Sequence, residues 1–410
     1  MSTATTITPT TPATPPPFTA DGGRSLIGLG LAARLPTAMT PLALLLAVSG
    51  ATGSFTLAGS VVALASLAGA AGGPLAGMVA DRTTQRLVVL TVTVAQSVGL
   101  LAMAVALRVD APVGWLLLAT AAVGFFNPVI GSMARSQWAA RSRPRADRHN
   151  FLSRAMGWEA ASDEISYVLG PIVASLVTGY VGSVACLLTV MVLALVTHTA
   201  FALLPQPQAL PSLDATATAA PQESRLAALR RLGPVVGAVA AVGVVFGSTQ
   251  TALAARFAAT DQTEITGLVY ACLGIGSALS GVAVARFPSQ VPMTTRMTGF
   301  GAALAVSALL LQPAPSPWFQ ALACFVVGLS VAPVLASAYV LAELRSPAGA
   351  STAVMTVLAT MTATGVGLGA AGSGPILEHL SVEGALALPV LAGLVVTACG
   401  LAARRGDSRV

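Results

Sequence analysis

Charged and aromatic residues are scarce in this chain of 410 residues. Only 9% of the residues are charged and 5% are aromatic, whereas about a quarter of the residues in a soluble domain carry a charge. So few charges cannot cover a surface that faces water, which excludes a soluble enzyme. Lysine is absent, the four cysteines form no CxxC pair, and the three histidines lack metal-ligand spacing. The sequence therefore predicts no metal site and no disulfide framework.

Long apolar runs make up most of what is present. Hydrophobic residues account for 55% of the chain, and the mean hydropathy is +0.81. A helix of about 20 residues crosses a bilayer core of ~30 Å, and runs of that length recur without the alternation that a membrane β-barrel requires. We predict an all-α membrane protein with twelve spans, at 26–49, 54–80, 87–107, 112–134, 153–178, 182–204, 234–255, 265–285, 294–312, 317–342, 349–377 and 384–403.

The arginines test this count, because basic residues gather in the cytoplasmic loops of membrane proteins. Eighteen of the 21 arginines fall on one side of the predicted spans, Arg108 and Arg256 fall on the other side, and Arg34 lies within a span. We therefore expect a multi-pass protein of the cell membrane with both termini in the cytoplasm. The sequence pI near 9.8 then reflects topology, and no nucleic-acid partner is expected.

The sequence divides into two halves of six spans. A start rich in Thr and Pro predicts a disordered tail, and a Pro-rich segment with a basic end separates spans six and seven. The halves share an ordered set of Gly, Arg and Gly-Pro positions at an offset of 204 residues, which is typical of transporters built from two bundles. The predicted units are a cytoplasmic tail (1–24), an N-terminal bundle (25–204), a cytoplasmic linker (205–233) and a C-terminal bundle (234–405).

The segment that follows the second span carries a motif. It reads GMVADRTTQR and resembles the G-x-x-x-D-R-x-x-x-R signature of the major facilitator superfamily. The first span also looks like that of actinobacterial exporters of this superfamily. The resemblance implies two six-helix bundles that rock about a central site, and a cytoplasmic latch favouring the outward-open state, formed by Gly77, Asp81, Arg82 and Arg86. Alternatively, the two arginines only anchor the topology; the second half has Ala285 in place of the aspartate.

Span five carries three acidic residues well inside its apolar run, namely Glu159, Asp163 and Glu164. A charge costs on the order of 3 kcal/mol at the bilayer centre, so each of these residues needs a partner or a function. Glu159 and Asp163 lie four residues apart and share a helix face, whereas Glu164 points elsewhere. The helical rise of about 1.5 Å per residue puts Arg34, the one basic residue assigned to a span, at the same depth. We expect Arg34 to pair with Glu159 and Asp163.

One basic group cannot neutralise three carboxylates, so we expect at least one of them to hold a proton near neutral pH. The pattern predicts a proton-coupling site that consists of Arg34, Glu159, Asp163 and Glu164. Such a site uses the proton gradient and needs no other cofactor. Alternatively, the charges are partly hydrated and only hold helices together, because charge networks can be purely structural.

Gly170-Pro171, further along span five, resembles the helix-five motif G-x-x-x-G-P-x-x-G of superfamily antiporters, with Ser166 and Ala174 replacing the outer glycines. A proline kinks a helix and small residues permit close contact. Ordinary packing therefore explains this motif almost as well as a role in the direction of transport. An arginine that such antiporters often carry in helix four is missing, because Ala119 occupies its place.

The remaining polar residues of the spans are candidates to line a central cavity. The cavity looks apolar, which suits a small amphipathic molecule. We expect a proton-linked exporter of small hydrophobic or amphipathic compounds that works as a monomer in the lipid bilayer. An importer of sugars or other nutrients on the same fold, and a transporter-like sensor without turnover, stay open as alternatives, whereas no enzyme is expected because no catalytic constellation occurs. The candidate cavity residues are Asn127, Ser248, Thr249, Gln250 and Tyr339.

Overall fold

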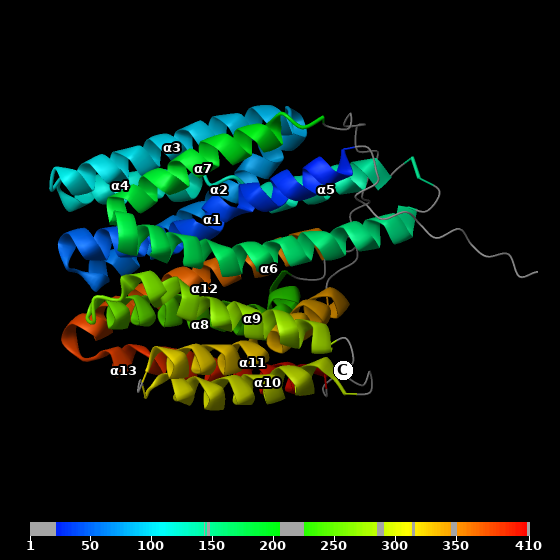
Figure 1. Cartoon of the computed structure of the whole chain (residues 1–410). Coiled ribbons are helices and arrows are strands. Elements are labelled where there is room, and N and C mark those ends of the chain that lie inside the picture. The colour runs from blue at the N-terminus through cyan, green and yellow to red at the C-terminus, as the bar shows by residue number, and fades with distance from the viewer. Residues whose placement is uncertain are drawn as a thin grey trace, which may run out of the picture.

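A computed structural model of the chain describes residues 22–142, 144–145, 148–205, 225–284, 291–313, 316–345 and 351–407. Twelve stretches of these residues are long and apolar enough to cross a membrane, which confirms the predicted number of spans. The helices run roughly side by side along one axis (Figure 1). We call the end of the bundle at which Gly22 and Asp407 lie the terminal side, and the other end the opposite side.

The first half of the chain contains seven helices. Helix α1 begins on the terminal side, and the following helices alternate in direction, except that α4 and α5 together make one crossing. Their bounds are α1 Gly23–Thr52, α2 Phe55–Arg82, α3 Gln85–Arg108, α4 Val113–Phe125, α5 Ile130–Ser142, α6 Arg148–Val181 and α7 Ser183–Ala202.

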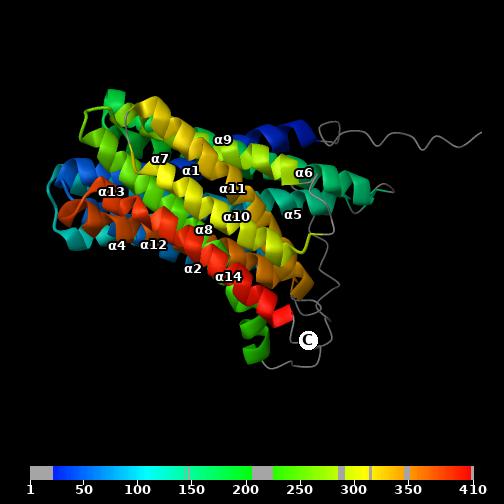
Figure 2. The same ribbon diagram turned by 90° about the horizontal axis from the view of Figure 1, so that it is seen from below.

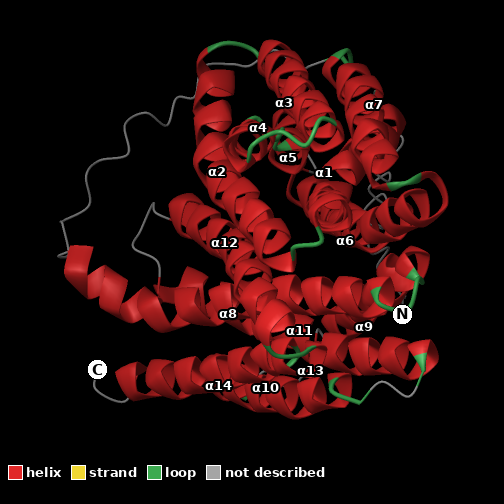
Figure 3. Cartoon of the chain, turned by 90° about the vertical axis from the view of Figure 1, so that its left-hand side faces the viewer, coloured by secondary structure: helices red, strands yellow, loops and turns green. Residues whose placement is uncertain are grey.

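The second half repeats the six crossings with short 3-10 turns at two of its ends. It forms a second group of helices below the first in Figure 1, and the end-on view of Figure 3 separates the two groups. The elements are α8 Arg225–Ala258, η3 Thr263–Ile265, α9 Thr266–Val284, α10 Met293–Ala308, η4 Leu309–Leu311, α11 Pro317–Arg345, α12 Ser351–His379, α13 Val382–Ala385 and α14 Ala387–Asp407.

Two boundaries differ from the sequence prediction. The fourth span was expected to run unbroken over 112–134, but it stops at Phe125 and resumes at Ile130, because Asn127-Pro128 interrupts the helix. A proline cannot donate the backbone hydrogen bond that would carry the helix through. The predicted linker 205–233 lies mostly outside the described residues, and its last part, from Arg225, already belongs to α8. Most of the predicted tail likewise lies outside them.

Packing within each half relies on small side chains. One apolar cluster fills the second half, and two fill the first half around α1. At the opposite side, Trp115, Tyr180 and Trp318 are exposed near the ends of their helices. Aromatic side chains with a polar atom favour the boundary between lipid and water, so these residues mark one edge of the apolar zone. The inclined helices of this zone are seen from below in Figure 2.

The two halves meet mainly toward the opposite side. There α2 packs on α12 and α6 packs on α9. A Cβ added at Gly374 would lie 2.6 Å from the carbonyl oxygen of Phe55, so the backbones of α12 and α2 touch directly. Glu378, near the end of α12, accepts hydrogen bonds from Ser54 Oγ (2.6 Å), Thr56 Oγ1 (2.6 Å) and Thr56 N (3.0 Å). We call this contact the Glu378 clamp.

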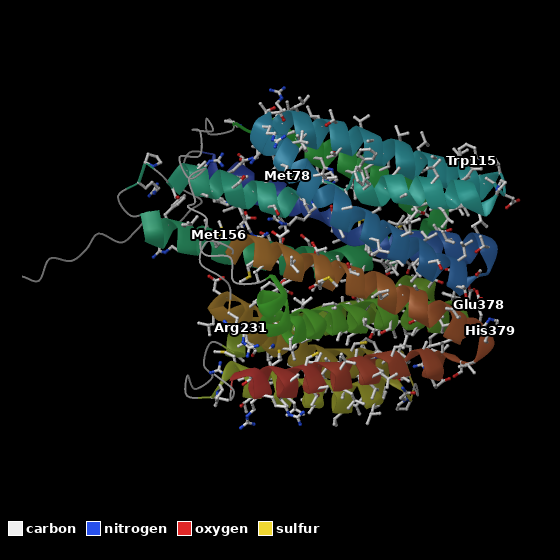
Figure 4. All side chains as sticks on the ribbon, turned by 180° about the vertical axis from the view of Figure 1, so that it is seen from behind. Met78, Trp115, Met156, Arg231, Glu378 and His379 are labelled. Carbon is white, nitrogen blue, oxygen red and sulfur yellow. The ribbon has the colours of Figure 1, made fainter. Side chains whose placement is uncertain are left out.

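Toward the terminal side, the facing parts of α2 and α12 are exposed. A Cβ added at Gly77 of α2 would meet no described atom within 4 Å. Met78 and Val79 beside it are exposed, as is Val357 near the start of α12. Figure 4 shows Met78 at one end of the bundle and Glu378 with His379 at the other. Contact between α2 and α12 is therefore concentrated toward the opposite side.

Candidate functional site

A cluster of charged side chains lies inside the first half, between α1 and α6. The guanidinium of Arg34 donates from Nε to Asp163 Oδ1 at 2.7 Å, from Nη2 to Glu159 Oε2, and from Nη1 to the carbonyl oxygen of Gly30 at 2.8 Å. Helix α6 packs along α1, so residues four apart on α6 can face one arginine. The structure thus brings Arg34 together with two of the three acidic residues of the sequence-derived site.

A second arginine joins this cluster, which sequence analysis missed. Arg135 of α5 forms a salt bridge with the other carboxylate oxygen of Asp163. The expectation that Arg34 is the one basic residue within a span was wrong, because the helix resumes at Ile130 after the break and continues to Ser142. The available signal was Trp138 three residues after Arg135, which predicts that both side chains share one helix face.

Trp138 holds the buried end of the cluster. Its indole Nε1 donates to Glu159 Oε1 at 2.8 Å, so both oxygens of this carboxylate have partners. Glu159 is 1% exposed and Trp138 is fully buried. A buried carboxylate is tolerated when it is paired and fully hydrogen-bonded, and both conditions hold here.

The cluster becomes more accessible away from Glu159. The exposed side-chain fraction is 1% for Glu159, 7% for Arg34, 30% for Asp163 and 39% for Arg135. Arg34 and Arg135 both lie against Gly131, where an added Cβ would be 3.4 Å from one guanidinium and 3.3 Å from the other. Two like charges this close require the shared anion Asp163 between them. The series therefore links a buried carboxylate to a partly open one through alternating charges.

Glu164 stands apart from this series. Its side chain is exposed, and within the part of the chain that the structure describes it has no hydrogen bond or ion pair. The charge that acts on it is the carboxylate of Asp163, which repels it. The two arginines are thus committed to Glu159 and Asp163, and the third acidic residue is left without a cation.

The break between α4 and α5 lies beside the cluster. Asn127 Oδ1 accepts hydrogen bonds from Gln96 Nε2 of α3 (3.1 Å) and from Thr37 Oγ1 of α1 (3.3 Å). An interrupted helix is tolerated at membrane depth only where its freed polar groups find partners. Asn127, a candidate cavity residue, is therefore engaged in holding three spans around the break.

The other candidate cavity residues differ in their surroundings. Ser248 and Thr249 of α8 are fully buried, and the hydroxyl of Ser248 donates to the carbonyl oxygen of Val244 at 2.6 Å. Gln250 is also buried. These three do not face open space in this conformation. Tyr339 of α11 is half-buried.

Gly170-Pro171 lies where α6 touches both α1 and α9. A Cβ at Gly170 would lie 2.7 Å from the Ala38 carbonyl carbon, and one at Gly267 would overlap the carbonyl group of Pro171. The first contact belongs to the N-terminal half and the second joins the halves. A bend at this point would change both contacts together.

The motif after span two contributes two arginines to the described surface. Arg82 and Arg86 are exposed, and neither forms an ion pair with a described residue. The side chain of Asp81 lies outside the described residues. The latch stays a prediction.

Comparison with known proteins gives the fold a context. The family model described as Major Facilitator Superfamily matches residues 26–370, whereas no curated protein matches the chain. A mutant of the nucleoside transporter NupG has a TM-score of 0.73 at 16% identity, covering 93% of this chain and 98% of that one. An auto-inhibited POT family peptide transporter gives 0.64 at 15% identity (93% and 96% covered). The human organic anion transporter MFSD10 gives 0.59 at 18% (92% and 98%). At these identities the likeness concerns the fold alone.

Proposed function

Because the chain belongs to the Major Facilitator Superfamily, we propose that it is a proton-coupled exporter of small hydrophobic or amphipathic compounds. The observation that carries the proposal is the unequal number of charges in the cluster. Arg34 and Arg135 are paired with Glu159 and Asp163, and Glu164 has no cation among the described residues. An unpaired carboxylate within a span is costly when ionised, so Glu164 exchanges its proton with water when the protein opens.

The opening and closing of the two halves gives this exchange a direction. With the terminal side in the cytoplasm, this conformation faces inward, because the halves touch at the opposite side. The outward-facing state then requires the Glu378 clamp to part and the terminal side to close, with Gly77, Asp81, Arg82 and Arg86 forming a latch. Rigid rocking of two bundles around a fixed site is how many transporters of this architecture alternate access.

Two features support export. The helix-five Gly-Pro motif lies at the junction of α1, α6 and α9, where a bend alters both half-internal and inter-half contacts. Several exposed residues of α6 and α9 are aliphatic, among them Ile165, Leu169 and Leu279, which suits compounds that dissolve in the bilayer. The names of the structural neighbours cover nucleosides, peptides and organic anions, so the fold by itself selects no substrate.

Flux in proteoliposomes tests the proposal. A pH gradient is imposed, a pH-sensitive dye reports internal pH, and a panel of labelled amphipathic compounds reports transport. We expect substrate to move against its gradient as protons move down theirs. Asp163→Asn with Glu164→Gln should abolish proton-driven accumulation, whereas Glu383→Gln, outside the cluster on α13, should retain it.

Three results would count against the proposal. Unchanged proton-driven accumulation in the double variant would remove the coupling role of the acidic residues. Proton-driven uptake by intact cells, in place of efflux, would favour an importer. Binding of compounds without flux in any gradient would favour a transporter-like sensor.

A further inference from the structure

A groove runs along the surface between α6 and α9. Its volume is about 290 Å³. Four of the residues along it are exposed aliphatic side chains, two on each helix, and a membrane-crossing helix exposes such side chains to lipid. The groove therefore opens toward the bilayer. The residues that line it are Glu164, Ile165, Val168, Leu169, Ile275, Ala278 and Leu279.

The groove exists because the two helices touch at one end of it. A Cβ at Gly274 would lie 2.8 Å from Val168 Cγ2, and Ser175 Oγ donates to the Glu264 carbonyl oxygen at 3.0 Å further toward the opposite side. These contacts hold α6 and α9 together on the opposite side of the groove. Glu164 and Ala278 line the groove on the terminal side of the Val168–Gly274 contact.

Glu164 is the one ionisable residue in the groove wall. On α6 it lies next to Ile165, which faces the lipid, and three residues before Tyr167, whose phenol lies within electrostatic reach of Asp163, Glu164 and both arginines of the cluster. A step of three residues places Glu164 and Tyr167 on neighbouring positions of the helix surface. Glu164 thus lies between the bilayer-facing groove and the charge cluster.

Charge complementarity indicates what the groove binds. On α6 the charged neighbour of Glu164 is Asp163, which repels a second anion. The arginines of α1 and α5 are held by Glu159 and Asp163. From α9, the lining residues Ile275, Ala278 and Leu279 are all aliphatic. An uncharged guest would leave Glu164 without compensation, and an anion would be repelled.

We propose that this groove is a lateral binding site for amphipathic organic cations, which enter from the bilayer with their apolar part against α9 and their charged group on Glu164. The inference rests on the proposed function and names its substrate class. A cation and a proton cannot both occupy the same carboxylate. Arrival of the cation therefore releases the proton to water, and arrival of a proton releases the cation, which is the exchange that an antiporter requires.

Binding to the purified chain in nanodiscs tests this site without any gradient. Labelled octyltrimethylammonium is the probe, 1-octanol is its uncharged comparison, and empty nanodiscs provide the background. We expect saturable binding of the cation but not of the alcohol. In weak buffer with a pH indicator, about one proton should be released for each cation bound, because both compete for one carboxylate.

Three variants locate the binding. Glu164→Gln should weaken cation binding at least about tenfold, which corresponds to about 1.4 kcal/mol, and should abolish proton release. Ala278→Trp fills the groove and should weaken binding while leaving the carboxylate in place. Leu268→Trp, at an exposed position of α9 outside the groove, is the matched control and should bind normally.

The outcomes separate this inference from the proposed function. No saturable binding of the cation, or binding in Glu164→Gln and Ala278→Trp as tight as in the unchanged chain, would overturn the lateral site even when proton-driven flux of other compounds persists. Cation binding with proton release but without flux in any gradient would uphold the site and overturn the exporter. Size-exclusion chromatography of each variant checks that a loss of binding does not come from unfolding.

Discussion

Helices α6 and α12 occupy equivalent places in the two halves and carry opposite chemistry. Both cross the membrane with a Gly-Pro pair, and these pairs are 204 residues apart. At the same offset, the three acidic positions of α6 correspond to Ala363, Gly367 and Leu368 of α12. Arg34 corresponds to Ala238 and Arg135 to Tyr339. The charge cluster thus belongs to one half alone.

The second half uses neighbouring positions for close backbone packing. An added Cβ at Gly365 would overlap the Ala240 carbonyl oxygen, and one at Gly247 would overlap that of Val366. Such contacts bring the backbones of α8 and α12 directly against each other. We infer that the two helices have different roles. Helix α12 forms a rigid wall that packs closely against α2, whereas α6 carries groups whose charge can change during transport.

We expect the largest effect on stability from removing the positive charge of Arg34 in the first half. Arg34→Ala leaves Glu159 buried beside Trp138 without a cation, and breaking a buried ion pair on one side typically costs about 3–5 kcal/mol. We expect a strong fall in the thermal unfolding temperature, measured by tryptophan fluorescence in detergent. An unchanged unfolding temperature would show that the cluster is already hydrated.

A triple variant sharpens the same test. Arg34→Ala with Glu159→Ala and Asp163→Gly gives the first half the residues found at the equivalent positions of the second half. Because no uncompensated buried charge remains from these pairs, we expect most of the stability lost in Arg34→Ala to return. Proton-driven flux should stay absent, which separates the structural contribution of the cluster from its role in coupling.

The second half should be most sensitive to added volume. Gly247→Ala places a methyl group against the Val366 carbonyl group, and overpacking of a close contact costs about 1–3 kcal/mol. Gly77→Ala adds the same group where no described atom lies within 4 Å, so it serves as a control with little expected change. A tolerated Gly247→Ala would mean that α8 and α12 can separate more easily than this packing implies.

The Glu378 clamp joins the rigid wall to the moving half, and its loss should shift the conformational equilibrium. Glu378→Gln removes the negative charge that the start of α2 attracts, so we expect a severalfold gain in outward-facing molecules. Ser66→Cys lies on α2 beside Gly367 of α12, and its labelling by a membrane-impermeant maleimide, in a chain without other cysteines, reports opening. Glu383→Gln at the same side is the control, and equal labelling of the two variants would refute the clamp.

Much of this architecture follows from composition, whereas the site does so only in part. Apolar runs of sufficient length gave the twelve spans, and counting residues along spans one and five placed Arg34 at the level of Glu159 and Asp163. Arg135 could not be assigned, because its place depends on a helix that restarts after Asn127-Pro128, and a proline in an apolar run is compatible with a kink, a break or an end. Ser248 and Thr249 show the converse, since periodicity does not distinguish a packed face from a cavity wall.

The break itself gives the smallest and most local prediction. In the second half, Val331-Ala332 occupies the place of Asn127-Pro128, and α11 continues through it without interruption. Asn127→Val with Pro128→Ala should therefore favour a continuous helix, at a loss of two hydrogen bonds worth about 1 kcal/mol each. A longer helix would rotate Arg135 relative to Asp163, so proton-driven flux should fall more than stability does. A fall in flux no larger than the loss of stability accounts for would mean that the interruption contributes only to packing. The asymmetry between the halves would then lie in the charged residues alone.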